Sequence, residues 1–261
     1  MDFLKRELAP ITANGWKEIE ERATAVLSKE LSARKFIRVT GPLGRDITSV
    51  TTGRMDVKTK DDIKYGVYKI QPLTESRICF PLSRWELDNI ERGAKDVDYS
   101  SLDDGVRKAA KFEEEAIFKG LEDGQIDGIY KSSSYETLDF GKTADETLKA
   151  IFDGILKLDA AFAKKPYVLV VSNEKWYYLN TIVKEYSLPE KLEKILGQKI
   201  VVSKSIDGAI LLPFDDENIE LVIGEDYAIG YQNHNESVVE LFVTESFTFR
   251  VLDPALIVLF K

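Results

Sequence analysis

The polar segment from Arg45 to Ile70 limits the fold of this chain more than any other stretch. It is rich in Thr, Asp and Lys and has few helix signals, and apolar residues alternate in Met55–Val57 and in Ile63–Tyr68. This pattern predicts a long two-stranded hairpin with little apolar surface. Because an isolated hairpin is marginal in water, the segment must pack either on another subunit or on the core of its own chain. The sequence allows both.

Composition and charge exclude several common classes of protein. The 261 residues carry a net charge of −9, which argues against a protein that coats nucleic acid. No apolar run is long enough to cross a bilayer, and the charged N-terminus lacks the apolar segment of a secretion signal. One cysteine and one histidine exclude an intrachain disulfide, a cysteine-rich zinc site and a multi-histidine metal site. We therefore expect a cytoplasmic protein with no metal, no nucleic-acid partner and no membrane partner.

Helix and strand signals alternate along the rest of the chain and indicate an α+β protein. Thr12 can cap a first helix, whose apolar residues recur at three- and four-residue steps: Trp16, Ile19, Ala23, Val26, Leu27 and Leu31. A strand at Arg77–Phe80, a helix at Ser83–Arg92 and a long helix from Ser101 to Leu121 follow, and Ser101–Asp104 resembles a capping box. Thr143–Glu146 caps another helix in an α/β middle third. The last fifty residues predict separate strands, among them Val238–Val243 and Ser246–Leu252.

A search for catalytic chemistry finds no strong motif. Nucleotide-binding glycine loops and a serine nucleophile elbow are absent from the sequence. His234 lies between two asparagines and is expected in a surface turn, and Cys79 in an apolar strand is expected to be buried. The run Glu113–Glu115 has no Glu-x-x-His partner motif, so we interpret it as a solvated helix face.

Several stretches, in order and from end to end, resemble the encapsulins. These are bacterial and archaeal shell proteins that share the fold of tailed-phage major capsid proteins. The similarity is carried by Met1–Pro10, Arg34–Phe36 before Gly41-Pro42, Trp85–Gly93 with Val97–Leu102 and Phe112–Phe118, and Leu241–Phe249. It identifies the chain as a suspected family 1 encapsulin, of the linocin- or maritimacin-like kind.

The resemblance implies how the chain is divided. Residues 1–44 would form an N-terminal arm and helix of the peripheral domain, and residues 45–70 would be an extended loop that lies on a neighbouring subunit. Residues 71–128 and 213–251 would complete the peripheral domain, with the long helix as its spine. Residues 129–212 and 252–261 would form the axial domain.

The resemblance also implies function. The chain would self-assemble into an icosahedral nanocompartment, about 60 copies in the smallest closed shell, and would have no catalytic residues. Such shells enclose a cargo enzyme, ferritin-like or peroxidase, that carries a C-terminal targeting peptide, and they pass small solutes or iron through pores.

Three sets of site residues follow from the resemblance. The peptide would bind between the N-terminal helix and the peripheral domain, with candidates Val26, Leu27, Leu31, Arg34, Arg38, Ile229, Val239 and Leu241; Arg38 stands where the family can have an acidic residue. The five-fold pore loop would comprise Lys184, Glu185, Tyr186, Ser187, Leu188 and Pro189. No cofactor is required, but a flavin (FMN) could bind on the shell at Arg77 and Trp85.

Other functions compatible with the same fold remain open at this point. A major capsid protein of a prophage or virus would share the architecture, although the acidic charge argues mildly against packaged DNA. A peptidase or bacteriocin is opposed by the lack of a convincing histidine or cysteine site.

Overall fold

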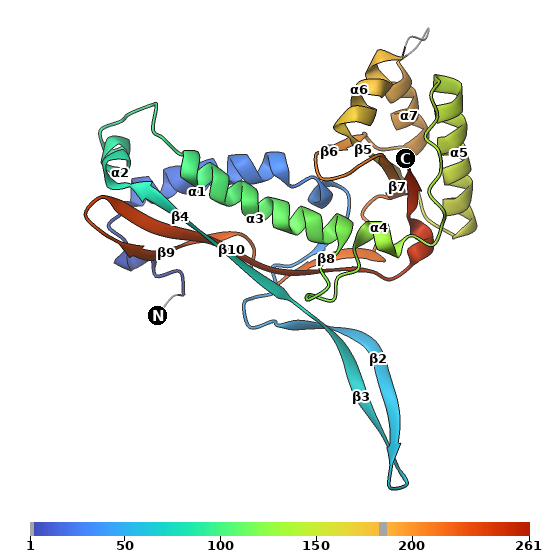
Figure 1. Cartoon of the computed structure of the whole chain (residues 1–261), viewed down its shortest axis with the longest axis horizontal. Coiled ribbons are helices and arrows are strands. Elements are labelled where there is room, and N and C mark those ends of the chain that lie inside the picture. Colours follow the sequence, from blue (N-terminus) through green and yellow to red (C-terminus); the bar gives the residue numbers. More distant parts are fainter. Residues whose placement is uncertain (1–2, 183–186) are drawn as a thin grey trace.

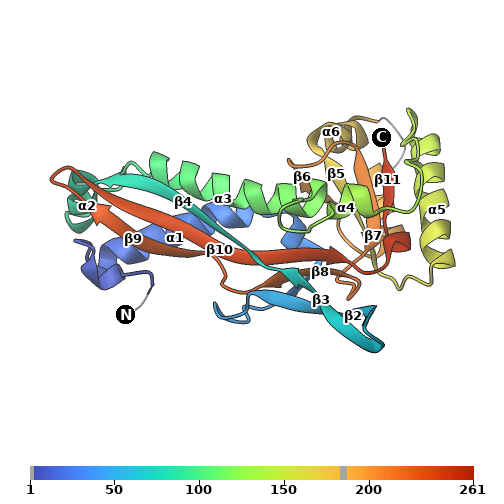
Figure 2. The same cartoon turned by 60° about the horizontal axis from the view of Figure 1, so that its bottom comes forward.

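A computed structural model describes residues 3–182 and 187–261. Its longest strand, β10 (Val238–Val251), forms the axis of the first sheet. β10 pairs antiparallel with β4 (Thr74–Ser83) on one side and with β8 (Ile219–Ile223) and β9 (Ala228–His234) on the other, and β1 (Arg38–Thr40) adds to β8 in parallel. Figure 2 shows β10 running along this whole sheet.

The predicted division of β10 into two strands is wrong. Thr244 and Glu245 looked like a polar break, but they continue the ladder opposite Arg77 and Ser76 of β4. Both are 1% exposed. The strand tolerates these buried polar residues because their side chains find partners inside the protein, as the Thr244 hydroxyl does on the Ser76 carbonyl at 2.7 Å. The turn expected at His234 is likewise the end of strand β9, where His234 is exposed.

Two helices cover one face of the first sheet and lie against each other (Figure 1). α1 (Ala13–Glu30) begins as predicted, with the Thr12 hydroxyl accepting the Gly15 N–H at 3.0 Å. α3 (Ser100–Lys119) begins without the predicted capping box, because Ser101 already lies inside the helix and its hydroxyl donates to the Pro81 carbonyl. A short helix, α2 (Arg84–Glu91), closes the far end. The core between these layers is apolar and includes Ile19, Phe80, Leu102, Val106, Val239 and Leu241.

A second sheet lies at the other end of the molecule. Its strand order is β11 (Val258–Phe260), β7 (Ala209–Pro213), β5 (Tyr167–Ser172) and β6 (Val201–Ser203). It is packed by α5 (Ala144–Ala160), α6 (Asn173–Thr181) and α7 (Leu188–Leu196), while α4 (Gly128–Ser132) follows α3. The predicted capping box of Thr143 and Glu146 is present at the start of α5. The domain boundaries expected from the sequence stay a prediction.

The polar segment that begins at Arg45 forms a hairpin that projects from the middle of the molecule (Figures 1 and 2). Its strands are β2 (Ser49–Lys60) and β3 (Ile63–Pro72), and almost every residue beyond the base is exposed. Of the two alternatives that the sequence left open, packing on its own core is therefore excluded. Apolar side chains remain in solvent on it, including Val57 at 69% and Tyr68 at 75% exposure.

The expectation that Cys79 is buried is also wrong. β4 alternates in burial, so that Phe80 and Leu82 face the core whereas Arg77 and Cys79 face outward. Within the described part of the chain, no helix could cross a membrane.

Candidate functional site: a groove beside helix α1

A groove of 480 Å³ lies between the C-terminal half of α1 and the turn that joins β8 to β9. It is lined by Thr24, Leu27, Ser28, Leu31, Arg34, Lys35, Asp226 and Tyr227. Leucine side chains and the tyrosine ring give it apolar walls, and two basic residues and one acidic residue give it charge. Such a mixture suits an extended peptide with apolar side chains and a polar anchor.

Arg34 is the most connected residue of the groove. Its guanidinium binds Glu113 of α3 (3.0 Å from Nε to Oε1), Asp226 (2.9 Å) and Glu245 of β10. It also lies over the Tyr227 ring, 5.0 Å from the ring centre. Burial opposes its positive charge, but the hydrogen bond to Glu113 and the three carboxylates raise the pKa of the guanidinium. Arg34 therefore fastens the end of α1 to α3 and to the sheet.

The interpretation of Glu113–Glu115 as a solvated helix face is wrong for two of the three residues. Glu113 and Glu114 are 0% and 1% exposed, because α3 turns this face toward the segment that follows α1. Glu114 accepts hydrogen bonds from the Ser32 hydroxyl and from the Ala33 N–H, the latter at 2.7 Å. Burial nevertheless raises the pKa of Glu114 to about 7. The sequence alone does not show this burial, because the polar partners of these two acids lie far away in the chain.

The structure brings together only some of the residues expected to bind a peptide. Leu27, Leu31 and Arg34 line the groove. Val26 lies in the core under α1, as do Ile229, Val239 and Leu241, which are 4%, 0% and 0% exposed. These four residues are corrected to core positions, because their strands and helix turn them toward the inner layer. Sequence reasoning missed Tyr227, Lys35 and Asp226 of the groove.

Arg38 does not line the groove either. Its Nε donates to Asp215 Oδ1 at 2.7 Å and its guanidinium also reaches the Asp215 carbonyl at 2.8 Å. It therefore fixes the turn before β8, and its difference from the family pattern does not alter the charge that lines the groove.

The expected pore loop is shorter than predicted. Ser187 is exposed and caps α7, accepting the Glu190 N–H at 3.4 Å. Leu188 and Pro189 form the first turn of α7 and are buried, so they are helix residues and not loop residues. Lys184, Glu185 and Tyr186 lie outside the described residues, and their role in a pore stays a prediction.

The flavin site expected at Arg77 and Trp85 stays a prediction. Arg77 lies over the Phe242 ring at 4.3 Å, whereas Trp85 is 71% exposed and is contacted by Arg92 at 5.7 Å. About 20 Å of extended strand separates Arg77 from Ser83 at the end of β4, given the usual rise per residue.

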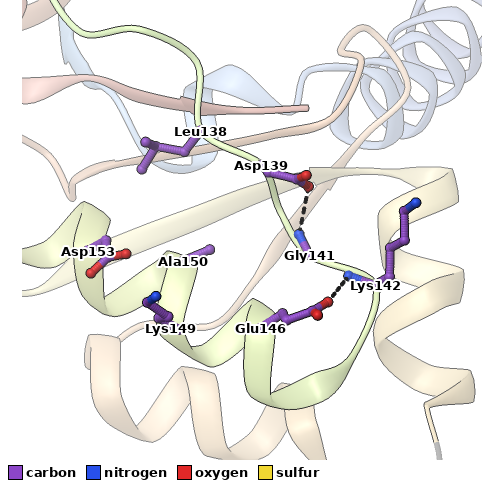
Figure 3. A pocket seen from close by; sticks show the side chains of 8 residues that line it. All are labelled: Leu138, Asp139, Gly141, Lys142, Glu146, Lys149, Ala150 and Asp153. Atoms are coloured by element: carbon purple, nitrogen blue, oxygen red, sulfur yellow. Dashed lines mark hydrogen bonds between the residues drawn. The ribbon is translucent and has the colours of Figure 1, made fainter.

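A second hollow of 410 Å³ lies at the start of α5 (Figure 3). Two of its three acidic residues bind the backbone: Asp139 accepts the Gly141 N–H at 3.0 Å, and Glu146 accepts the Lys142 N–H at 2.8 Å. The hydrogen bond from the Lys142 backbone lowers the pKa of Glu146. Because these hydrogen bonds hold the backbone at the start of α5, we assign the hollow a structural role. Across the described residues, no group of three or more His, Cys, Asp or Glu could hold a metal.

We predict that Glu114→Gln reduces the loss of thermal stability between about pH 5 and pH 8. The native carboxyl keeps its proton up to a pKa of about 7, whereas the unfolded carboxyl loses it near 4.5. Between these values the folded state binds more protons, so stability falls as pH rises, by at most ~3 kcal/mol. The permanently neutral amide removes this contribution. The thermal midpoint, measured by calorimetry across the pH range, provides the check.

Glu115→Gln is the matched control for this prediction. Glu115 is the next residue on α3, but it is paired with Lys119 near the surface. The control should leave the pH profile unchanged. An identical profile for the wild type and Glu114→Gln would contradict the prediction.

Comparison with known proteins agrees with this architecture. Residues 1–248 match the family described as "Encapsulating protein for peroxidase". The type 1 encapsulin shell protein of Rhodococcus erythropolis is 34% identical over 95% of this chain and 96% of its own length. Among solved structures, the virus-like particle of Pyrococcus furiosus has a TM-score of 0.70 at 18% identity, covering 94% of this chain and 98% of that one.

A phage capsid protein gives the same fold at lower similarity. The capsid of the myovirus XM1 has a TM-score of 0.57 at 14% identity, covering 87% of this chain and 90% of that one. At this identity the likeness carries the fold alone. The sequence family and the architecture together lead to one conclusion: this chain belongs to the encapsulin shell proteins, which form icosahedral shells on the tailed-phage major capsid fold.

Proposed function

We propose that the shell built by this protein encloses a cargo enzyme, and that the groove beside α1 binds the cargo's C-terminal targeting peptide. The observation that carries this proposal is the groove itself, which combines apolar walls from Leu27, Leu31 and Tyr227 with a free polar rim at Lys35. Lys35 is exposed, and the described structure gives it no side-chain ion pair. The family description, which names encapsulation of a peroxidase, supports an enzyme as the cargo.

The proposed work of the subunit is mechanical and not catalytic. The curated relatives are named as shell proteins. The Arg34 guanidinium is already paired with three carboxylates. It would therefore shape the groove and not anchor the peptide. The resemblance to encapsulins supports a cytoplasmic compartment that would admit small solutes or iron through its pores.

Blocking the groove should prevent cargo loading without affecting the shell. Ser28 is exposed on α1 and lines the groove, so Ser28→Trp places an indole where the peptide would lie. The test uses a fluorescent reporter fused to the last ten or so residues of the enzyme that co-purifies with the native shell. We expect at least a tenfold loss of reporter per shell, about 1.4 kcal/mol of binding energy, measured by fluorescence after size exclusion.

The control carries the same substitution elsewhere on the same helix. Ala25 is exposed but does not line the groove, and Ala25→Trp should load normally. Equal loading of both variants would overturn the assignment of the groove.

We further propose that the hairpin β2–β3 packs on a neighbouring subunit in a shell of about 60 copies. Its directly paired residues Met55 and Tyr68 share one face with Val57, and these apolar side chains are all exposed in the single subunit. Burial of one such side chain at an interface contributes about 1.5–3 kcal/mol. Repetition at every interface of a closed shell would make this contribution decisive.

Val57→Asp should therefore yield folded subunits that fail to form shells. Electron microscopy and native mass spectrometry would show small oligomers, while circular dichroism would remain that of the wild type. Lys58→Ser, the neighbouring residue on the opposite face of the hairpin, should assemble normally. Intact shells from Val57→Asp would contradict a role of this face in assembly.

A flavin on the shell remains a proposal for the exposed Trp85. An indole face in solvent can stack on an isoalloxazine ring, and an arginine such as Arg77 can offset the charge of the flavin. Purified shells should then show flavin absorbance in the visible range, and Trp85→Ala should lose it with the shell intact. A spectrum without a flavin band, even after incubation with FMN, would remove the proposal.

A further inference from the structure

One positive group, Arg34, and three carboxylates bonded to it meet beneath the groove. The charged and titratable side chains that face one another there come from four segments: Arg34 after α1, Glu113 and Glu114 on α3, Asp226 and Tyr227 in the turn before β9, and Glu245 on β10. Asp226 is about half exposed and is stabilised by water, but Glu113 and Glu245 are 0% and 1% exposed. One guanidinium cannot neutralise both buried carboxylates in addition to Asp226.

The hydrogen bonding of the cluster supports the same conclusion. In the described structure, Oε2 of Glu245 and the hydroxyl of Tyr227 are buried and form no hydrogen bond of normal geometry, although the two groups interact with each other. An ionised carboxylate oxygen in this situation would cost several kcal/mol, whereas a protonated one would not carry the charge. Burial first, and then the charge of Glu113, raise the pKa of Glu245 well above its ordinary value.

We infer that Glu113 and Glu245 share one proton in the folded subunit, and that this proton latches Arg34 into the wall of the groove. Removal of the proton to solvent leaves two buried anions against one cation. Burial of this second anion destabilises the packed arrangement in which Arg34 lies over the Tyr227 ring, and both of these residues line the groove. The wall of the groove therefore loses stability as pH rises towards the raised pKa of Glu245, and its stability is constant above that pKa.

Infrared spectroscopy of the assembled shell tests the shared proton directly. At about pH 8 Glu114, with a pKa of about 7, is mostly ionised, so a remaining carbonyl band of a protonated carboxylic acid reports the Glu113–Glu245 pair. We expect this band in the wild type and in Glu114→Gln. It should disappear in Glu245→Gln and also in Glu113→Gln, because the single remaining carboxyl becomes the counter-ion of Arg34. Absence of the band in the wild type would overturn the inference.

Hydrogen exchange tests the latch. Protection of the backbone over residues 24–36 should fall by up to tenfold for each pH unit between about pH 7 and the raised pKa of Glu245, and it should level off above that pKa. Glu245→Gln, which cannot acquire the second charge, should keep its protection, whereas Glu114→Gln should lose it as the wild type does. Equal profiles for the wild type and Glu245→Gln would mean that the cluster is a static anchor.

The consequence for cargo rests on the proposed function of the groove, and the two can fail separately. Loading of the peptide-tagged reporter should decrease at alkaline pH in the wild type and remain steady in Glu245→Gln. No loading at any pH, with the infrared and exchange results as expected, would overturn the groove as the peptide site but not the shared proton. Normal loading that does not depend on pH would overturn the latch alone.

Discussion

The charge balance around Arg34 is the constraint on which the peripheral part of the subunit depends. One guanidinium connects the end of α1 to α3, to the turn before β9 and to the middle of β10. These segments are distant in sequence, and the apolar core between α1, α3 and the sheet does not by itself fix how far α1 extends over them. Truncation of Arg34 would leave Glu113 and Glu245 as buried and unpaired acids, a far larger disturbance than the loss of a surface ion pair.

The same cluster explains why the groove has its shape. Leu27 and Leu31 stand on α1, while Tyr227 and Asp226 stand on the opposite wall, and Arg34 touches both walls. The lining can be apolar and still hold charged residues because those charges are satisfied below it. A partner therefore meets a surface in which Lys35, rather than Arg34, is available for a new ion pair.

The projecting hairpin relates the subunit to the shell. Beyond the base its strands are exposed within one chain, so their apolar residues would gain contacts from other copies in the proposed shell. The weak alternation of the segment had indicated a hairpin, and its poverty in apolar residues had indicated a need for support. The sequence does not show which surface the hairpin packs on, because an exposed strand and a strand covered by its own chain can have the same residue pattern.

Local signals predicted the elements well where the chain itself supplies the partners. Thr12 and Thr143 cap their helices because the bonded N–H groups lie three residues away. The predicted cap at Ser101 is absent because the helix begins one residue earlier and the Ser101 hydroxyl donates to the Pro81 carbonyl of β4. Leu27, Leu31 and Arg34 were found through the resemblance to encapsulins, whereas Val239 and Leu241 could not be separated from core positions by pattern alone.

The sequence by itself determined the hairpin, the amphipathic α1, the α+β class and, through an end-to-end resemblance, the shell family. Only the tertiary structure decided that Glu113 and Glu114 are buried, that β10 is continuous through Thr244 and Glu245, and that Cys79 faces outward. The physical reason is common to the two buried acids and to the continuous strand. A polar side chain is expected in solvent until its partner is known, and these partners lie about 80 to 210 residues away in the chain.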